Sequence, residues 1–264
     1  SNRVLGTYTH VLDYRNPFGD KFPRVTRSDG AGSLVFGTEN FSTGNLLRQK
    51  NLTLNESFKF VVGKSLFTLG ADYLHSNAYN VFIRDLFGTY TYASLNDFIT
   101  NAKPTRYDHS FSLLENTTNE ANSPSAAAFR FANYAFFAND EIKLNNNFTL
   151  NAGLRVEKTD YLDQPREDKF FNDSAIAILS NLYDLHGARS GQITKVPFSF
   201  SPRLGFIYKV PNENVTIRGG MGLFAGRIPL VWPGGVYTQN GMSLGGCGNN
   251  NPNITFSADP LNQY

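Results

Sequence analysis

A strict alternation of apolar and polar residues limits what this chain can fold into more than any other feature. In the segment 148–157 (FTLNAGLRVE), every second residue from the first phenylalanine is apolar, and the residues between are polar or glycine. Successive side chains of a β-strand point to opposite faces of its sheet, so this run predicts a strand with one apolar and one polar face. The segments 52–62, 204–210 and 215–223 follow the same pattern with single exceptions, such as Ile207.

The predicted strands come in pairs that are joined by short polar turns at 63–64, 145–147 and 211–214. Short clusters of Gly, Asn and Pro between alternating runs are typical of β-hairpins. The links between the pairs are long and polar, and short turns that alternate with long loops are typical of transmembrane barrels. We therefore predict hairpins near 46–75, 130–160 and 199–227, and long loops near 76–127, 161–197 and 229–264.

The first 45 residues are less regular than the rest of the chain. The run 4–14 (VLGTYTHVLDY) predicts a further strand. The segment 30–37 (GAGSLVFG) is either a strand or part of a loop that folds inward.

The composition favours a membrane barrel over a soluble β fold. Charged residues make up only 17% of the chain and aromatic residues 14%, and no apolar run approaches the length of a transmembrane helix. A mean hydropathy of −0.32 suits a barrel, because only every second strand residue faces lipid. The alternative is a soluble β-sandwich or propeller, in which a second sheet covers the apolar face. We favour an all-β, antiparallel transmembrane β-barrel with long extracellular loops, in the bacterial outer membrane and in contact with its lipid.

A closed barrel turns its apolar face to lipid and its polar face to an aqueous lumen, because unpaired backbone groups are costly in hydrocarbon. Five charged residues lie on the polar faces of the predicted strands and are expected to face the lumen: Arg155, Glu157, Arg203, Lys209 and Arg218. Four aromatic residues near strand ends are expected in the interfacial girdles: Phe136, Phe148, Tyr161 and Tyr208.

The sequence offers no pattern for an enzyme, a metal site or a cofactor, and none is predicted. The four histidines lie far apart, at His10, His75, His109 and His186. The triplet Asp108–Ser110 holds an Asp, a His and a Ser, but neighbours on a strand point apart. The single cysteine, Cys247, excludes an internal disulfide. A net charge of +2 without a dense Lys/Arg cluster predicts no binding to nucleic acid.

Aromatic residues in the predicted long loops are the candidate ligand contacts. They are Tyr107, Phe111, Tyr183, Trp232 and Tyr237. Exposed rings at these positions would pack against an extracellular ligand such as a sugar or a peptide and bind it. The alternative, which we favour, is that the loops pack on one another through these rings.

Three segments carry a family resemblance. The run 136–161 (FFANDEIKLNNNFTLNAGLRVEKTDY) resembles a hairpin that is found in TonB-dependent outer-membrane receptors. The first strand of that hairpin carries an aromatic residue followed by Gln or Asn, Asp and Glu. After the turn, the second strand carries Leu-Thr-Leu and Gly-Leu-Arg. The runs 201–210 and 215–232 resemble the next hairpin of the Oar-like branch of Bacteroidetes-type bacteria, above all in RGGMGLFAGR. The run 65–92 resembles an earlier hairpin, and the resemblance covers most of 45–237.

The resemblance implies a 22-stranded barrel with an N-terminal plug inside it. Transport through such a barrel would be driven by the TonB complex of the inner membrane. We find about seven to nine strands, no plug-like region and no TonB-box segment. The chain is therefore expected to be an internal part of such a barrel, with the plug that contacts TonB outside it. The first functional hypothesis is a receptor for nutrient uptake, the second is a structural or adhesive Oar-like protein, and the third is a hydrolase embedded in a barrel.

Overall fold

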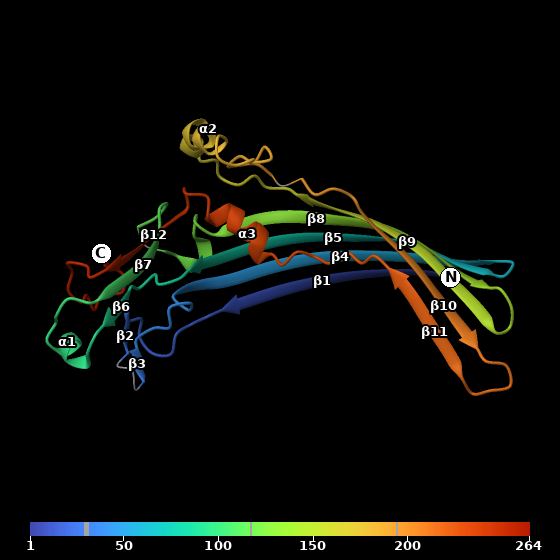
Figure 1. Ribbon diagram of the computed structural model, residues 1–264, viewed down its shortest axis with the longest axis horizontal. Helices are drawn as coiled ribbons and strands as arrows, with labels where there is room; N and C mark the ends of the chain where they lie inside the picture. The colour runs from blue at the N-terminus through green and yellow to red at the C-terminus, as the bar shows by residue number, and fades with distance from the viewer. Residues whose placement is uncertain (29–31, 117, 194) are drawn as a thin grey trace.

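A curved sheet of seven long strands forms the main body of the computed structural model, which describes residues 1–28, 32–116, 118–193 and 195–264. The strand order is β1-β4-β5-β8-β9-β10-β11, and all neighbours are antiparallel. We call this sheet the wall (Figure 1). Its strands are β1 (Asn2–Tyr14), β4 (Gly44–Val62), β5 (Ser65–Ile83), β8 (Ala127–Lys143), β9 (Phe148–Tyr161), β10 (Ser199–Lys209) and β11 (Thr216–Gly222).

The central wall strands are longer than the sequence pattern predicts. Strands β4 and β5 each have 19 residues, whereas a strand needs only about 9–11 residues to cross a membrane. The loop predicted near 76–127 therefore begins only after Ile83. This extension was not predicted from the sequence, because apolar and polar residues no longer alternate strictly once a strand leaves the membrane.

The long loops build a second sheet at one end of the wall, opposite the end that holds the short turns (Figure 1). Its strand order is β12-β7-β6-β2-β3, with β2 and β6 parallel. Its strands are β2 (Arg24–Ser28), β3 (Ser33–Phe36), β6 (Thr89–Tyr92), β7 (Arg106–Ser112) and β12 (Leu244–Asn250). The irregular segment 30–37 thus supplies β3, although Gly30 and Ala31 lie outside the described residues.

The helical segments are short and lie in the loops. They are α1 (Leu95–Ile99), η1 (Glu120–Asn122), η2 (Phe171–Ala175), α2 (Ile176–Leu179) and α3 (Val231–Thr238). None of the helices in the described part of the chain is long and apolar enough to cross a membrane.

A tyrosine cluster forms the core of the second sheet. Tyr90, Tyr92 and Tyr107 are buried together with Val25, and the rings of Tyr90 and Tyr107 lie 4.8 Å apart. The Tyr90 hydroxyl donates to Gln263 at 2.8 Å, and burial raises the pKa of Tyr90 to about 12. Three loops far apart in the sequence are therefore packed into one ordered unit.

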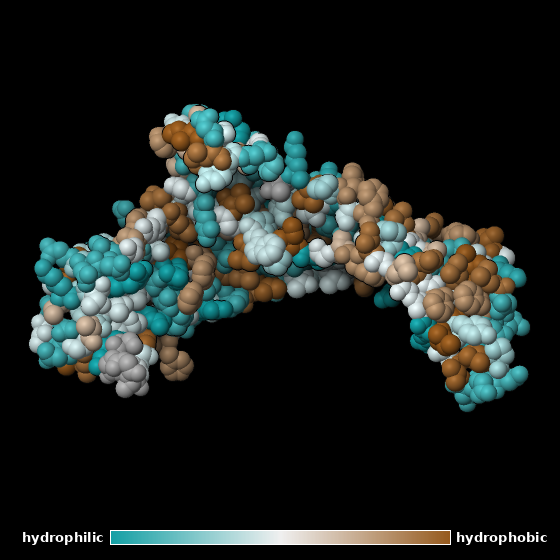
Figure 2. Space-filling model, viewed as in Figure 1, coloured by the Kyte–Doolittle hydropathy of each residue, from teal (hydrophilic) through white to brown (hydrophobic). Residues whose placement is uncertain are grey.

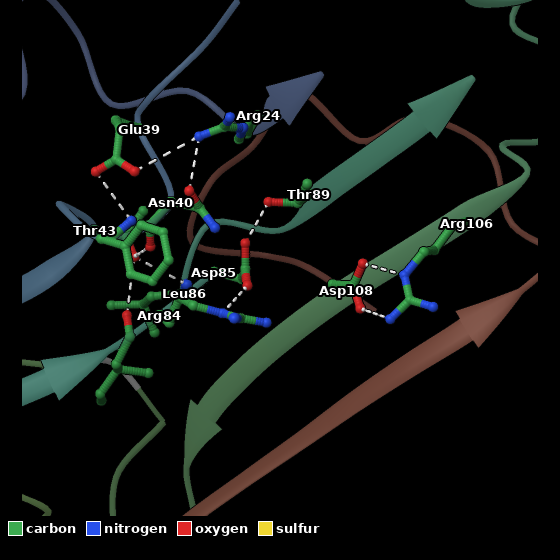
Figure 3. A network of polar contacts seen from close by, with 12 residues as sticks. Arg24, Glu39, Asn40, Thr43, Arg84, Asp85, Leu86, Thr89, Arg106 and Asp108 are labelled. Atoms are coloured by element: carbon green, nitrogen blue, oxygen red, sulfur yellow. Dashed lines mark hydrogen bonds and ion pairs between the residues drawn. The ribbon is translucent and has the colours of Figure 1, made fainter. Parts of the chain in front are cut away.

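A polar network ties the second sheet to the wall (Figure 3). Asp85, which follows β5 and is only 3% exposed, accepts hydrogen bonds from Thr89 at 2.5 Å and from Arg84 at 2.7 Å. Thr43, which precedes β4, donates to the carbonyl of Ile83 at 2.9 Å and accepts from the amide of Leu86 at 3.1 Å. These bonds satisfy the backbone where the wall strands end.

The register sorts the side chains of the wall onto two faces of opposite character. Leu54 lies opposite Tyr73, and Tyr73 lies opposite Tyr134, so these residues share the face that we call the outer face. Large apolar side chains stay exposed there, as with Phe136 at 67% and Leu154 at 45%. Figure 2 shows the molecule from the side on which α3 lies, where hydrophobic and polar residues are intermixed. The second sheet lies at the end of the wall and does not cover this face (Figure 1).

The wall does not close into a barrel within the described residues, since β1 and β11 each pair on one side only. The all-β architecture with an antiparallel wall agrees with the prediction, apart from the parallel pair β2 and β6 in the second sheet. A strand number of 22 stays a prediction.

We predict that charge on the outer face destabilises the protein in lipid and that charge on the opposite, inner face does not. Leu154 lies opposite Ala138 and Pro202 on the outer face, and Asn151 lies on the inner face of the same strand. In the full-length protein in lipid vesicles, L154R should lower the free energy of unfolding by about 2 kcal/mol, the order expected for arginine inside the bilayer. The matched variant N151R should change it by less than about 0.5 kcal/mol. Equal losses measured by denaturant titration would contradict the assignment of the faces.

Candidate functional site

The inner face of the wall carries a network of charged and amide side chains. Arg155 on β9 donates to Glu157 at 2.9 Å and also to Asp72 on β5. Asp72 accepts a further hydrogen bond from Asn55 on β4. Each of the three charged side chains is about a fifth to a quarter exposed. One arginine thus pairs with two carboxylates, which leaves a net charge of −1 on the three side chains, and it connects strands that do not pair directly.

The five predicted lumen residues share this inner face. Arg155 lies opposite Ser201, Arg203 lies opposite Gly153 and Gly222, and Arg218 lies opposite Ile207. The register of Lys209, opposite Thr216, places it on the same face. Arg155 pairs with Glu157 and lines a cavity of about 350 Å³ together with Arg203. The guanidinium of Arg203 also lies over the ring of Phe224 at 4.8 Å. That this face lines an aqueous lumen stays a prediction, because the wall is open.

The chain after β11 folds back across the inner face and leads into α3 (Figure 1). The ring of Tyr237 stacks on that of Phe129 at 4.6 Å, with an angle of 7° between the rings. The hydroxyl of Tyr237 donates to the carbonyl of Asp163 at 2.7 Å. Leu230 and Tyr161 pack against the same apolar cluster of the wall. Tyr161 therefore lies on the inner face, and its expected place in the lipid-facing girdle is wrong.

A cavity of about 440 Å³ lies between the inner face and the segment 225–230. Its apolar lining includes Leu74, Phe131, Tyr161 and Leu230. Its polar lining consists of Gln49, Asn51, Asn133, Glu157, Lys158, Thr159, Ser199 and Arg227. The polar groups are linked in pairs, since Ser76 donates to Asn51 at 2.7 Å and Asn133 donates to Thr159 at 2.9 Å. Amides and hydroxyls beside aromatic rings suit a ligand rich in hydroxyl or amide groups.

This cavity was not predicted from the sequence, although its lining residues form a recognisable pattern. Gln49, Asn51 and Asn133 occupy strand positions of the inner face, where uncharged amides stand close to the aromatic rings of Phe131 and Tyr161. The alternation assigns these residues to a polar face, but it does not show which strands are neighbours. The inward fold of the segment 225–230 is a matter of tertiary packing and has no local pattern.

The five loop aromatics are not gathered into one site. Tyr107 is 2% exposed in the core of the second sheet, and burial raises its pKa. Tyr237 packs on Phe129, and burial raises its pKa to about 12. These two rings serve packing, which leaves Tyr107 no surface for a ligand. Phe111, Tyr183 and Trp232 are 36%, 66% and 70% exposed, and their role in binding stays a prediction.

The residues considered for catalysis lie on the second sheet. Asp108 on β7 is held by the guanidinium of Arg106, with contacts of 2.6 and 2.7 Å (Figure 3). His109 is opposite Cys247 in the register of β7 and β12, and its Nδ1 lies 3.0 Å from the carbonyl oxygen of Tyr264. Among the described residues, no group of three or more His, Cys, Asp or Glu side chains is placed to hold a metal ion.

A long antiparallel wall with an exposed apolar outer face, a polar inner face, short turns at one end and ordered loops at the other defines an outer-membrane β-barrel protein. The profile of the family described as "Outer membrane beta barrel domain" matches residues 3–262. The chain belongs to this family and is located in the bacterial outer membrane. No curated protein and no solved structure shows significant similarity to it.

We predict that Arg155 stabilises the inner face by compensating two carboxylates. R155M leaves Asp72 and Glu157 facing each other without a cation, so the free energy of unfolding should fall by about 1–3 kcal/mol. The triple variant D72N/R155M/E157Q removes both negative charges and should recover most of this loss. Denaturant titration of the full-length protein in lipid vesicles measures both changes. If the triple variant were as unstable as R155M, the loss would come from packing and not from charge.

Proposed function

We propose that this chain supplies part of the wall and the extracellular loops of a TonB-dependent receptor that imports a nutrient too large for porins. The observation that carries the proposal is the cavity on the inner face, which the segment 225–230 covers. A ligand held there lies on the path from the loops into the barrel.

The content of the inner face supports a large barrel. In barrels of about eight strands, side chains alone fill the interior. Here the inner face holds a helix, a returning segment of chain and a cavity of about 440 Å³. The unpaired edges of β1 and β11 also require further strands in a membrane, because open sheet edges are not tolerated in hydrocarbon. Both points support a barrel of the 22-strand class, with room for a plug.

The partner implied by this function is the TonB complex, which would contact a plug domain outside this chain. The segments 136–161 and 201–232 carry the motifs that resemble TonB-dependent receptors. The lining of the cavity supports a ligand with many hydroxyl or amide groups, such as an oligosaccharide or a peptide.

A structural or adhesive role is the second candidate, and the second sheet favours it. The edge strand β3 has a neighbour on one side only in the described chain, and its Leu34 and Val35 are 43% and 46% exposed. An edge strand with exposed apolar side chains can recruit a strand from another protein. In this case the long loops would bind a protein of a neighbouring cell or of the matrix, and they would not deliver a ligand to a pore.

We predict that the full-length protein in detergent binds the purified periplasmic domain of TonB. Affinity should be in the micromolar range, typical of a transient partner, and a variant that lacks the segment N-terminal to the barrel should not bind. Fluorescence anisotropy with labelled TonB domain measures both. The variant L34K/V35K, which changes only the edge of the second sheet, serves as the control and should bind TonB normally. Absence of TonB binding by the intact protein would overturn import and leave the adhesive role.

A further inference from the structure

A cationic pocket lies on the outer face of the wall, which faces the membrane and its rim and not the interior. It has a volume of about 380 Å³. Its polar lining consists of Arg48 and Lys50 on β4, Asn77 and Tyr79 on β5, Arg130 on β8, and Asp163 beyond the end of β9. We call it the rim pocket. It shares none of these six residues with the cavity on the inner face.

The rim pocket lies just above the apolar part of the outer face. On β4 the outer-face positions from Leu52 to Val62 are apolar apart from Glu56, and these 11 residues match the length that crosses a membrane. Tyr8, Tyr73 and Tyr134 lie at or next to the level of Leu52 and Leu54 on neighbouring strands, as expected for an aromatic girdle. A tyrosine girdle marks the height of the lipid headgroups.

The cations begin directly beyond this girdle. Lys50 lies opposite His10 on β1 and opposite Asn77 on β5, and Asn77 lies opposite Arg130 on β8. Lys50 and Arg130 are thus separated by one strand, or roughly 10 Å between their backbones, with an amide between them. Long side chains at this spacing can converge on a single anion. The second sheet and the long loops lie at this end of the wall, so the rim pocket faces the outer leaflet.

The side chains of the rim pocket are partly held in place. The guanidinium of Arg48 lies 4.4 Å from the ring centre of Tyr79 and donates to the carbonyl of Ala121 at 2.9 Å. Tyr79 in turn donates to the carbonyl of Glu120 and accepts from the amide of Ser123, and these bonds hold the loop with η1 against Arg48 and Tyr79. A guanidinium fixed in this way loses little conformational freedom when it binds an anion.

Lys50 and Arg130 complete the charge of the rim pocket. Lys50 is exposed and makes no hydrogen bond or ion pair within the described part of the chain. Arg130 pairs with Asp163 at 2.7 Å, and this pairing holds the pKa of Asp163 below its usual range. Asp163 therefore stays ionised, and three cations with one carboxylate leave a net charge of +2. Nearby, Lys158 is paired with Asp160 and adds no net charge. The carboxylates of Glu115 and Glu120 lie near Tyr79 and Tyr14 and are not part of the lining.

We propose that the rim pocket binds the phosphate-bearing headgroup of the glycolipid in the outer leaflet. Arginine and lysine side chains complement phosphate oxygens, and basic pockets at the membrane surface bind anionic headgroups. The apolar outer face directly below the pocket offers room for the acyl chains of the same molecule, which a free phosphate ion does not have. The lipid would fasten the loop that contains η1 to the membrane surface. This assignment does not depend on transport, since it concerns the opposite face of the wall.

The test uses the full-length protein in detergent and a fluorescent, doubly phosphorylated lipid A as the probe. In the double variant R48Q/K50Q the pair of Arg130 and Asp163 is left intact. Each lost cation should weaken binding by about fivefold, so the double variant should bind about 25-fold more weakly than the unaltered protein. The matched control K59Q/K143Q removes the same charge from exposed lysines at the turn end of the inner face and should bind as the unaltered protein does.

Two further arms separate the lipid from other sources of phosphate. Dephosphorylated lipid A should bind at least about tenfold more weakly, and inorganic phosphate in large excess should not displace the probe. Together with the loss in R48Q/K50Q, these results support the proposal. Displacement by inorganic phosphate would show an anion site that does not recognise lipid. Equal binding of dephosphorylated lipid A, or of R48Q/K50Q and the control, would also overturn the proposal.

Discussion

The pairing of backbone groups in hydrocarbon is the constraint on which the rest of this structure depends. A strand in a membrane must place every amide and carbonyl in a ladder with its neighbours. The five strands between β1 and β11 meet this demand through six antiparallel pairings in unbroken register, while β1 and β11 each keep one edge unpaired within the described residues. Side-chain and turn hydrogen bonds, such as those of Thr43 and Asp85, satisfy the backbone where the strands end. With the backbone satisfied within the sheet, side chains are free to differ completely between the two faces.

The inner and outer faces of the wall carry different kinds of side chain. Alternate residues of one strand serve different surroundings, as on β8, where Phe129 and Phe131 are buried on the inner face and Arg130 is exposed on the outer face. On the inner face the charges are compensated in a network around Arg155, which suits a polar interior. On the outer face apolar side chains extend to the level of Leu52. Lys158 lies at the level of Leu54 but is paired with Asp160, and the cations of the rim pocket lie beyond that level.

The strict alternation in 148–157 and its repeats was sufficient to predict the wall, because strand period, short turns and lipid exposure are all local properties of the sequence. The second sheet was not predictable in the same way. It unites strands from three loops, and its core is made of tyrosines such as Tyr90 and Tyr107, which read equally well as exposed loop aromatics. Tyr161 was placed on the wrong face for the same reason, and the sequence could not decide between ligand contact and the favoured packing role for Tyr107. The environment of an aromatic residue depends on which distant segment packs against it. The inner cavity and the rim pocket likewise require knowledge of the strand order, which brings Gln49 beside Ser76 and Lys50 beside Asn77.

Asp163 connects the inner and outer surfaces at the extracellular end of the wall. Its backbone carbonyl accepts the hydrogen bond from Tyr237 on α3, inside the wall. Its carboxylate pairs with Arg130 on the outer face, and it also accepts from the backbone amide of Arg130 at 2.6 Å. Because α3 covers the inner face near the cavity, a movement of this helix either breaks the bond from Tyr237 or shifts the residue that holds Arg130. The segment that closes over the cavity and the cation at the membrane rim therefore share a single anchoring residue.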